Sequence, residues 1–370
     1  MLIHLFWQFF VLGCLSFGGP IAHVSYFQHR FVHQLAWLDD REFSRLYALC
    51  TLLPGPTSSQ LGFAIGYHRR GILGALAACI AFTLPSFTLM FTAAVGLINS
   101  NEIHWLKMHH AMALLAFLVV ADACAAMLKG LIQDRRQLIL VIIFTMGLVS
   151  GINTILLIVG AVLTGVIFHR SSPQITPQPK LSLNLTSTGL FACLLALSWW
   201  AGDSLFGGFY LTGSSVFGGG HVMLPILQHQ FSTVLDHQAL LSAYALAQAI
   251  PGPMFTIATY LGTVLSPDNP LIGALSATLG IFIPGFLAVL MFYKEWQHWQ
   301  EHSWVKAAMY TLNPAMIALL LSSLFTFIVP HSVHSLWDIA ALAIASLAFI
   351  FLPKGIIWAA VLLLASQFIG

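Results

Sequence analysis

The sequence predicts an all-α polytopic membrane protein made of two inverted-topology repeats. Its 370 residues are 58% hydrophobic and only 7% charged, with a mean hydropathy of +0.88, whereas a soluble domain carries roughly 25% charged residues. Apolar runs of about 20 residues fit the hydrocarbon thickness of a bilayer. The composition excludes a cytosolic enzyme and a disordered chain, and the net charge of +2 excludes a nucleic-acid binder.

Apolar stretches predict the membrane-embedded segments in chain order. We expect the first, 2–29, to be one interrupted span with the N-terminus outside. The stretch 189–200 is short for a span and suits an interfacial or re-entrant piece. The remaining stretches lie at 71–98, 108–131, 138–150 and 153–168, and then at 204–230, 271–293, 307–330, 337–351 and 355–369.

A weak internal repeat divides the chain. Phe17-Gly18-Gly19 matches Phe217-Gly218-Gly219, and Pro54-Gly55-Pro56 matches Pro251-Gly252-Pro253. Further matches keep the same order, with offsets that drift by at most three residues. We therefore expect a first repeat at 1–169, a hydrophilic linker at 170–188 and a second, inverted repeat at 189–370.

The distribution of lysine and arginine favours inversion. If each Pro-Gly-Pro region is a re-entrant hairpin, about ten helices cross the membrane, and 13 of the 14 basic residues fall on the cytoplasmic side, as membrane proteins prefer. If both regions cross, the repeats are parallel and the basic residues divide 7 to 7. An alternative of up to 13 spans, in which 189–200 crosses as well, keeps the inversion with a 10 to 4 division.

The repeated motifs break helices, and a break is tolerated in a membrane only where protein or a watery cavity replaces lipid. Proline lacks the backbone N–H, and paired interruptions in corresponding positions point to a transporter site. The residues expected to form the breaks are Pro20, Pro54, Gly55, Pro56, Pro251, Gly252 and Pro253.

Four broken elements are expected to meet near the midplane and to point half-helix N-termini at one place. Such N-termini bind anions through free N–H groups and the helix dipole. The predicted substrate-binding residues are Gly18, Gly19, His23, Thr57, Ser58, Ser59, Gln60, Gly219, Gly220, His221, Gln248 and Thr256. Asp122, a carboxylate within an apolar stretch, is a candidate for proton coupling, although a capping role is an equal alternative.

Neither an enzyme nor a metal site is predicted. The five cysteines are scattered without a Cys-x-x-Cys pair, and the spacing of His104, His109 and His110 fits no standard metal site. Only one carboxylate lies within a span, and it has no facing partner for acid–base chemistry. We expect no cofactor.

The two break signatures together resemble the chromate ion transporter family in its long, two-domain form. The first half matches in Phe17-Gly18-Gly19-Pro20, Leu53-Pro54-Gly55-Pro56 and Leu84-Pro85-Ser86. The second half matches in Phe217-Gly218-Gly219-Gly220-His221 and in Ala247 to Pro253. Thr57-Ser58-Ser59 departs from the asparagine-containing run expected after Pro-Gly-Pro.

The resemblance implies export of chromate across a bacterial plasma membrane, with sulfate or another small oxyanion as the alternative substrate. Moving two charges through 100 mV is worth about 4.6 kcal/mol, so an inside-negative potential favours outward movement of a dianion. A sulfate importer would need a coupled ion, for which His221, His23 and Asp122 are candidates. The expected partners are chromate or sulfate and membrane lipid, and a homodimer remains open.

Overall fold

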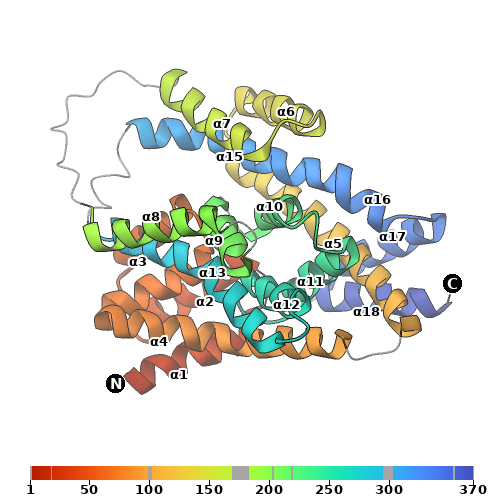
Figure 1. Ribbon diagram of the computed structural model, residues 1–370, viewed down its shortest axis with the longest axis horizontal. Coiled ribbons are helices and arrows are strands. Elements are labelled where there is room, and N and C mark those ends of the chain that lie inside the picture. The colour runs from red at the N-terminus through yellow and green to blue at the C-terminus, as the bar shows by residue number, and fades with distance from the viewer. Residues whose placement is uncertain are drawn as a thin grey trace.

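The computed structural model describes residues 2–17, 19–98, 102–168, 183–201, 204–217, 220–294, 303–352 and 355–369, and every regular element within them is a helix (Figure 1). Among the described residues, four segments are long and apolar enough to cross a membrane, and shorter apolar helices accompany them. The four are Thr57–Gly96, His110–Leu131, Pro270–Phe292 and Lys306–Ser332. The prediction of an all-α, multi-pass membrane protein is confirmed.

The chain begins with a hairpin of short helices, α1 (Leu2–Leu15) and α2 (Gly19–Gln28), which the π-helix η1 (His29–Gln34) continues. Arg30 Nε donates to Gln8 Oε1 at 2.7 Å, and His23 Nε2 lies 3.1 Å from the Ser16 carbonyl. Residues near the end of α1 contact the start of α2, and a residue further back in α1 contacts η1. This order of contacts requires α1 and α2 to be antiparallel. The expectation that 2–29 forms one interrupted span is therefore wrong: the break after Phe17 reverses the chain.

A second hairpin of helices follows. α3 (Asp40–Leu52) begins where Asp39 accepts a hydrogen bond from the Glu42 backbone N–H, and α4 (Thr57–Ile98) begins after Pro54-Gly55-Pro56. The carboxylate of Glu42 lies 3.8 Å from His68 Nε2, and the guanidinium of Arg69 lies 5.4 Å from the centre of the Trp37 ring. The segment from 40 to 69 therefore starts and ends at the same end of the molecule.

α4 is two helical arms joined by a turn. Arg70 and Gly71 have non-helical backbone angles, and the turn folds the chain so that Gly66 packs directly against Gly74. The second arm then runs on to Ile98 through Pro85. Gly13 of α1 packs against the backbone of Phe82 in this arm.

The second half contains similar elements after one additional helix, α8 (Leu185–Trp200). α9 (Leu205–Ser215) leads to a 3-10 turn and a short helix that fold back on it, because the Phe209 and Phe231 rings lie 4.6 Å apart. Gly262 packs against Gly273 just as Gly66 packs against Gly74. The elements after α9 are η2 (Gly220–Val222), α10 (Met223–Gln230), α11 (His237–Ala249), η3 (Met254–Thr256), α12 (Ile257–Val264) and α13 (Pro270–Phe292).

The remaining helices of the two halves pack on one another. α5 (Glu102–Leu131), α6 (Arg135–Val149) and α7 (Thr154–Phe168) complete the first half. α6 and α7 lie against α15 (Ser303–Ser323) of the second half, and α5 lies against α11 and α18 (Gly355–Ile369) (Figure 1). Between α15 and α18 the chain forms η4 (Leu324–Ile328), α16 (Val329–Ser332) and α17 (Leu336–Phe351).

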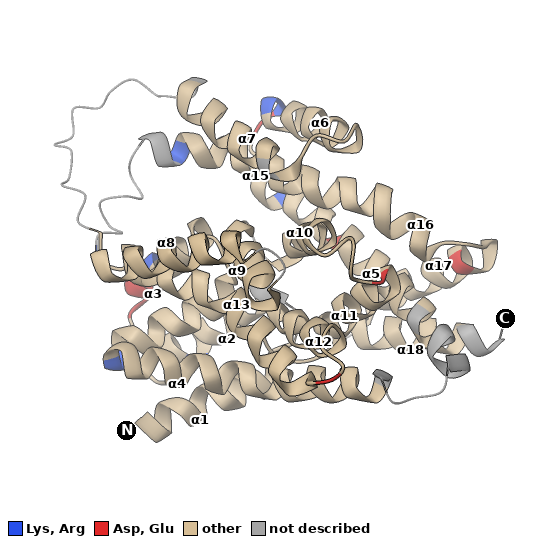
Figure 2. Cartoon of the chain, in the orientation of Figure 1, with Lys and Arg blue, Asp and Glu red and all other residues tan. Residues whose placement is uncertain are grey.

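The end of α13 lies beside the turn within α4. The Tyr293 hydroxyl, at the end of α13, lies 3.2 Å from His68 Nδ1, just before the second arm of α4 begins at the turn. Asn184, before the first residue of α8, donates a backbone hydrogen bond to the Met291 carbonyl, and the other end of α8 leads into α9. The few charged residues lie mainly near helix ends (Figure 2).

Candidate functional site

The break motif of each half is hydrogen-bonded to the first helix of the other half. The Gly55 backbone N–H donates to the Val216 carbonyl at 2.7 Å, and the Gly252 N–H donates to the Ser16 carbonyl at 2.9 Å. Ser16 and Val216 directly precede the two Phe-Gly-Gly motifs. The backbone therefore joins the four breaks, which lie far apart in the sequence, in two corresponding pairs.

Both central glycines adopt a backbone conformation that other residues disfavour, and neither has room for a β-carbon. Gly55 has a φ of +120° and Gly252 a φ of +110°, values that residues other than glycine rarely adopt. A β-carbon at Gly55 would lie 2.8 Å from Gly285 Cα, and one at Gly252 would lie 2.7 Å from Ser86 Oγ. The Pro85-Ser86 and Pro284-Gly285 segments thus pack against the Pro-Gly-Pro motif of the opposite half.

The helix N-termini predicted from the sequence begin beside these bonds. α2 begins at Gly19, α4 at Thr57, η2 at Gly220 and η3 at Met254. Helix termini leave backbone N–H groups without intrahelical partners, so each start offers donors to an anion. Gly18 and Gly219, two of the predicted binding residues, lie outside the described residues.

The polar residues after the first Pro-Gly-Pro are buried. Gln60 Nε2 donates to the Pro54 carbonyl at 2.8 Å and to the Gly285 carbonyl at 3.1 Å, so it connects the break to α13. Thr57, Ser58 and Ser59, in the turn before it, are also buried. Three buried hydroxyl groups therefore lie in the first turn of α4.

The predicted residues of the second half form a hydrogen-bonded group beside η2. His221 Nδ1 lies 2.8 Å from the Tyr244 hydroxyl and 3.5 Å from Gln248 Nε2. Thr256 donates its hydroxyl to the Pro253 carbonyl at 2.8 Å, which stabilises the turn after the second Pro-Gly-Pro. His221, Gln248 and Thr256 therefore lie next to the break, whereas Tyr244 was not foreseen from the sequence.

Asp122 is not brought to this group. It is exposed on α5, whereas Cys124 of the same helix is buried in the core cluster that contains Tyr244. Residues two apart on a helix point about 200° away from each other. The structure therefore directs Asp122 away from His221.

Ser16 and Ser86 are residues of this region that the sequence analysis did not single out. Each directly adjoins a motif that recurs in the second half, Ser16 before Phe17-Gly18-Gly19 and Ser86 after Pro85. Both are 1% exposed. The repeat itself was the signal that could have found them, because a polar residue at a helix break is conspicuous where its counterpart is Val216 or Gly285.

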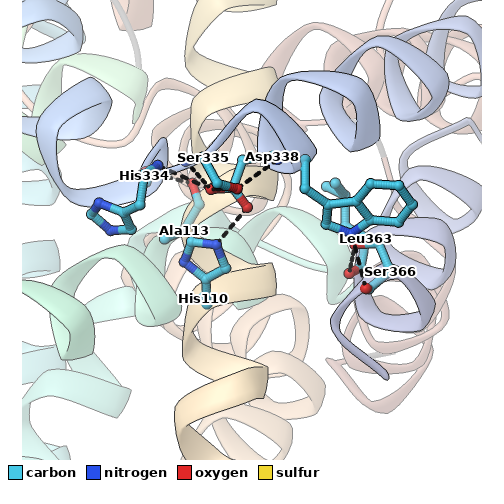
Figure 3. Close-up of polar contacts among 9 residues, drawn as sticks. His110, Ala113, His334, Ser335, Asp338, Leu363 and Ser366 are labelled. Atoms are coloured by element: carbon cyan, nitrogen blue, oxygen red, sulfur yellow. Dashed lines mark hydrogen bonds and ion pairs between the residues drawn. The ribbon is translucent and has the colours of Figure 1, made fainter. Parts of the chain in front are cut away.

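A second polar cluster lies away from the breaks and ties α5 to α17 (Figure 3). His110 Nε2 lies 2.7 Å from Asp338 Oδ1, and Asp338 also accepts hydrogen bonds from the backbone N–H groups of His334 and Ser335. Asp338 and Ser335 form a capping box at the start of α17. Within the described residues no group of three metal-ligating side chains occurs, and His110 is held in a helix-capping network.

Comparisons with known proteins place the chain in a family. It matches the chromate transporter family over residues 3–166 and 204–370, and therefore belongs to that family of multi-pass membrane proteins. The chain is 25% identical to the chromate transport protein of Pseudomonas aeruginosa, over 99% of this chain and 91% of that protein. It is 26% identical to the chromate transport protein of Cupriavidus metallidurans, over 76% and 72% respectively.

A further relative carries no substrate in its name. An uncharacterized transporter of Methanocaldococcus jannaschii is 24% identical over 95% of this chain and 90% of its own length. No solved structure matches the chain.

Proposed function

We propose that the protein exports chromate from the cytoplasm and binds the anion at the junction of the four helix breaks. The observation that carries this proposal is the pair of reciprocal bonds, Gly55 to Val216 and Gly252 to Ser16, because they bring helix N-termini of both halves to one region. The family and the names of two relatives support chromate as the anion. Sulfate is the alternative substrate.

The binding is carried by backbone N–H groups and hydroxyls. The side chains identified at the junction, such as Ser58, Gln60 and His221, include no lysine or arginine, so the anion is held by dipoles and single hydrogen bonds. A strong ion pair would slow release, whereas many weak donors allow an oxyanion to bind and leave. The donors belong to buried, packed helix starts. They are therefore oriented before the anion arrives.

The two halves are inverted repeats in this proposal. Support comes from Tyr293, which ends α13 beside His68, because the corresponding arm of α4 begins there and runs the opposite way. Each half then contributes two re-entrant hairpins, one around Phe-Gly-Gly and one around Pro-Gly-Pro. The contact between Glu42 and His68 supports the Pro-Gly-Pro hairpin of the first half.

The hairpin of α1 and α2 changes the topology expected from the sequence. The N-terminus lies on the cytoplasmic side, since Gln8 contacts Arg30, and α8 crosses the membrane instead of lying in its interface. The first hairpin removes one membrane crossing and α8 adds one, so the second half is still inverted. Lysine and arginine keep the 13 to 1 division that the positive-inside tendency favours.

Flux measurements in proteoliposomes test the function. Purified protein should move chromate, and an imposed potential of 100 mV should drive one net charge with about 2.3 kcal/mol or two charges with about twice that. Liposomes that contain the Gly252→Ala variant provide the control. Chromate flux equal to that of the variant, or flux indifferent to the potential, would refute electrogenic chromate transport, and flux of sulfate alone would select the alternative.

A further inference from the structure

Three polar groups near the first Phe-Gly-Gly break are buried without a hydrogen-bonding partner in the described part of the chain. They are Ser16 Oγ, His23 Nδ1 and Ser59 Oγ, and each of these residues is 2% exposed or less. A buried polar atom left unpaired costs about 1–3 kcal/mol. A ligand that pairs all three would recover that cost.

Helix contacts indicate the relative positions of the three residues. His23 is bonded to the Ser16 carbonyl, so it lies beside Ser16 across the first hairpin. One turn further along α2, the Phe27 ring would lie 3.4 Å from a β-carbon at Gly62 of α4, and Ser59 is one turn before Gly62. The unpaired atoms thus belong to one level of the packed hairpins, next to the start of α4.

The hydrogen bond of His23 fixes which of its ring nitrogens carries the proton. Ser16 offers a carbonyl oxygen, which only accepts, so Nε2 must donate. In neutral imidazole the other nitrogen is then an acceptor. The vacant hydrogen-bonding capacity at His23 Nδ1 is therefore a lone pair, which repels the oxygen of a fully ionised anion and attracts an O–H group.

We propose that the site binds the singly protonated oxyanion, with its O–H donating to His23 Nδ1 and its other oxygens accepting from the Ser16 and Ser59 hydroxyls. This inference rests on the proposed function and specifies the ionic form of the substrate. Gln60 has the same polarity: its Nε2 donates to two carbonyls, and its buried Oε1 is an unpaired acceptor. Two acceptors beside the site disfavour a bare dianion.

The second half offers no equivalent set. The counterparts of Ser16 and His23 are Val216 and Met223, and Thr256, the counterpart of Ser59, already donates its hydroxyl to Pro253. The side-chain recognition of the O–H group therefore belongs to the first half alone. The second half contributes backbone groups and the hydrogen-bonded side chains of His221, Tyr244 and Gln248.

The titratable groups packed around His23 leave it neutral in this proposal. α1 carries the Cys14 thiol and α4 the Cys79 thiol, and the Phe82 ring of α4 lies T-shaped to the His23 ring with ring centres 5.6 Å apart. Asp40 of α3 accepts a hydrogen bond from Gln28, five residues further along α2, and η1 carries its charged Arg30 beyond that. The proton at the site therefore comes with the ligand.

The protonated form distinguishes otherwise similar tetrahedral anions. Chromate takes up one proton near neutral pH, whereas sulfate and selenate remain dianions there. A site that demands an O–H group selects chromate over selenate, although the two are similar in size. It also moves one net negative charge for each chromate, where a bare dianion would move two.

The test measures uptake into proteoliposomes at pH 6, 7 and 8 with the membrane potential clamped. For the wild type we expect the KM for total chromate to rise about tenfold per pH unit once chromate is mostly ionised, selenate to be a poor substrate, and one charge to move per chromate. A KM independent of pH, or equal transport of selenate, would overturn the inference.

Variants at His23 isolate its role. His23→Leu should flatten the pH dependence and abolish the preference over selenate, and His23→Gln, which keeps a donor and an acceptor, should retain both. Met223→Leu, at the corresponding buried position, is the matched control and should behave as wild type. If His23→Leu fails to fold, the wild-type pH profile and charge count still decide.

The same experiment separates the inference from the function on which it rests. Wild-type protein that moves no oxyanion at any pH contradicts the proposed function. Wild-type protein that moves chromate with two charges and no pH dependence leaves that function standing and contradicts the protonated substrate.

Discussion

The two Pro-Gly-Pro breaks have the same backbone and different surroundings. Gly55 and Gly252 share a positive φ, a hydrogen bond to the opposite half and close contact with a kinked helix. Around the first half lie Ser16, His23 and Gln60, while Val216, Met223 and Ile257 occupy the corresponding positions. The two breaks therefore share their backbone geometry, whereas the side chains around them differ.

The largest loss of flux is expected at the two glycines that the breaks share. Gly55→Ala and Gly252→Ala should each lower chromate flux by about a hundredfold, because backbone strain of about 1–3 kcal/mol adds to displacement of the contacting helix. The two losses should be similar. Flux and the midpoint of thermal unfolding are the measurements.

Gly160→Ala is the control for both glycine variants. Nothing lies within 4 Å of a β-carbon at this position of α7, so its flux should equal that of the wild type. A large loss at one of the two break glycines and none at the other would contradict the equivalence of the two backbones.

The next effect should be asymmetric. Ser16→Ala removes an unpaired hydroxyl donor, and hydrogen bonds to charged groups are worth about 1.5–3 kcal/mol, so the KM for chromate should rise roughly 10- to 100-fold. Val216→Ala removes only apolar atoms and should leave the KM unchanged. Equal changes in the two KM values would show that recognition is shared between the halves.

A smaller effect on stability is expected at Gln60. Gln60→Met removes the donor to the Pro54 and Gly285 carbonyls, and the unpaired carbonyls should lower the free energy of unfolding by about 1–3 kcal/mol. Ile257→Met, at the corresponding position, should cost less than about 1.5 kcal/mol. Thermal unfolding in detergent compares the two, and an equal shift would mean that Gln60 contributes only its volume.

The last prediction concerns topology and should not affect transport. A cysteine introduced at His4 should react with an impermeant thiol reagent only from the cytoplasmic side, and one at His334 only from outside. Exposed Cys193 is replaced first to keep the background low. Labelling of position 4 from outside would restore the span expected over 2–29 and contradict the first hairpin.

The positions of the helices were largely predictable. The stretches predicted at 138–150, 153–168 and 355–369 correspond to α6, α7 and α18, since a long apolar run in a membrane has little choice but to form a helix. The direction of the chain after a break was not predictable in the same way. Phe17 marks where the first helix stops, but the packing of Phe9 against Phe27 reverses the chain.

The candidate site was predictable only in part. The repeated motifs identified Gln60, His221 and Gln248, which lie beside the breaks. They could not identify Ser16, Ser86 or Tyr244, because hydroxyl-bearing residues are common in apolar helices and only their partners distinguish them. The proton-coupling role of Asp122 stays a prediction for the same reason: a carboxylate in an apolar stretch attracts attention, but its direction depends on the neighbouring helices.

The sequence by itself determined the membrane environment, the repeat and the places where helices must stop, because these follow from local hydrophobicity and from proline and glycine chemistry. Only the tertiary structure decided which break meets which, and which polar atoms remain unpaired. The bonds from Gly55 to Val216 and from Gly252 to Ser16 join residues more than a hundred positions apart. Such long-range pairing depends on the packing of whole helices, which no single segment of the sequence determines.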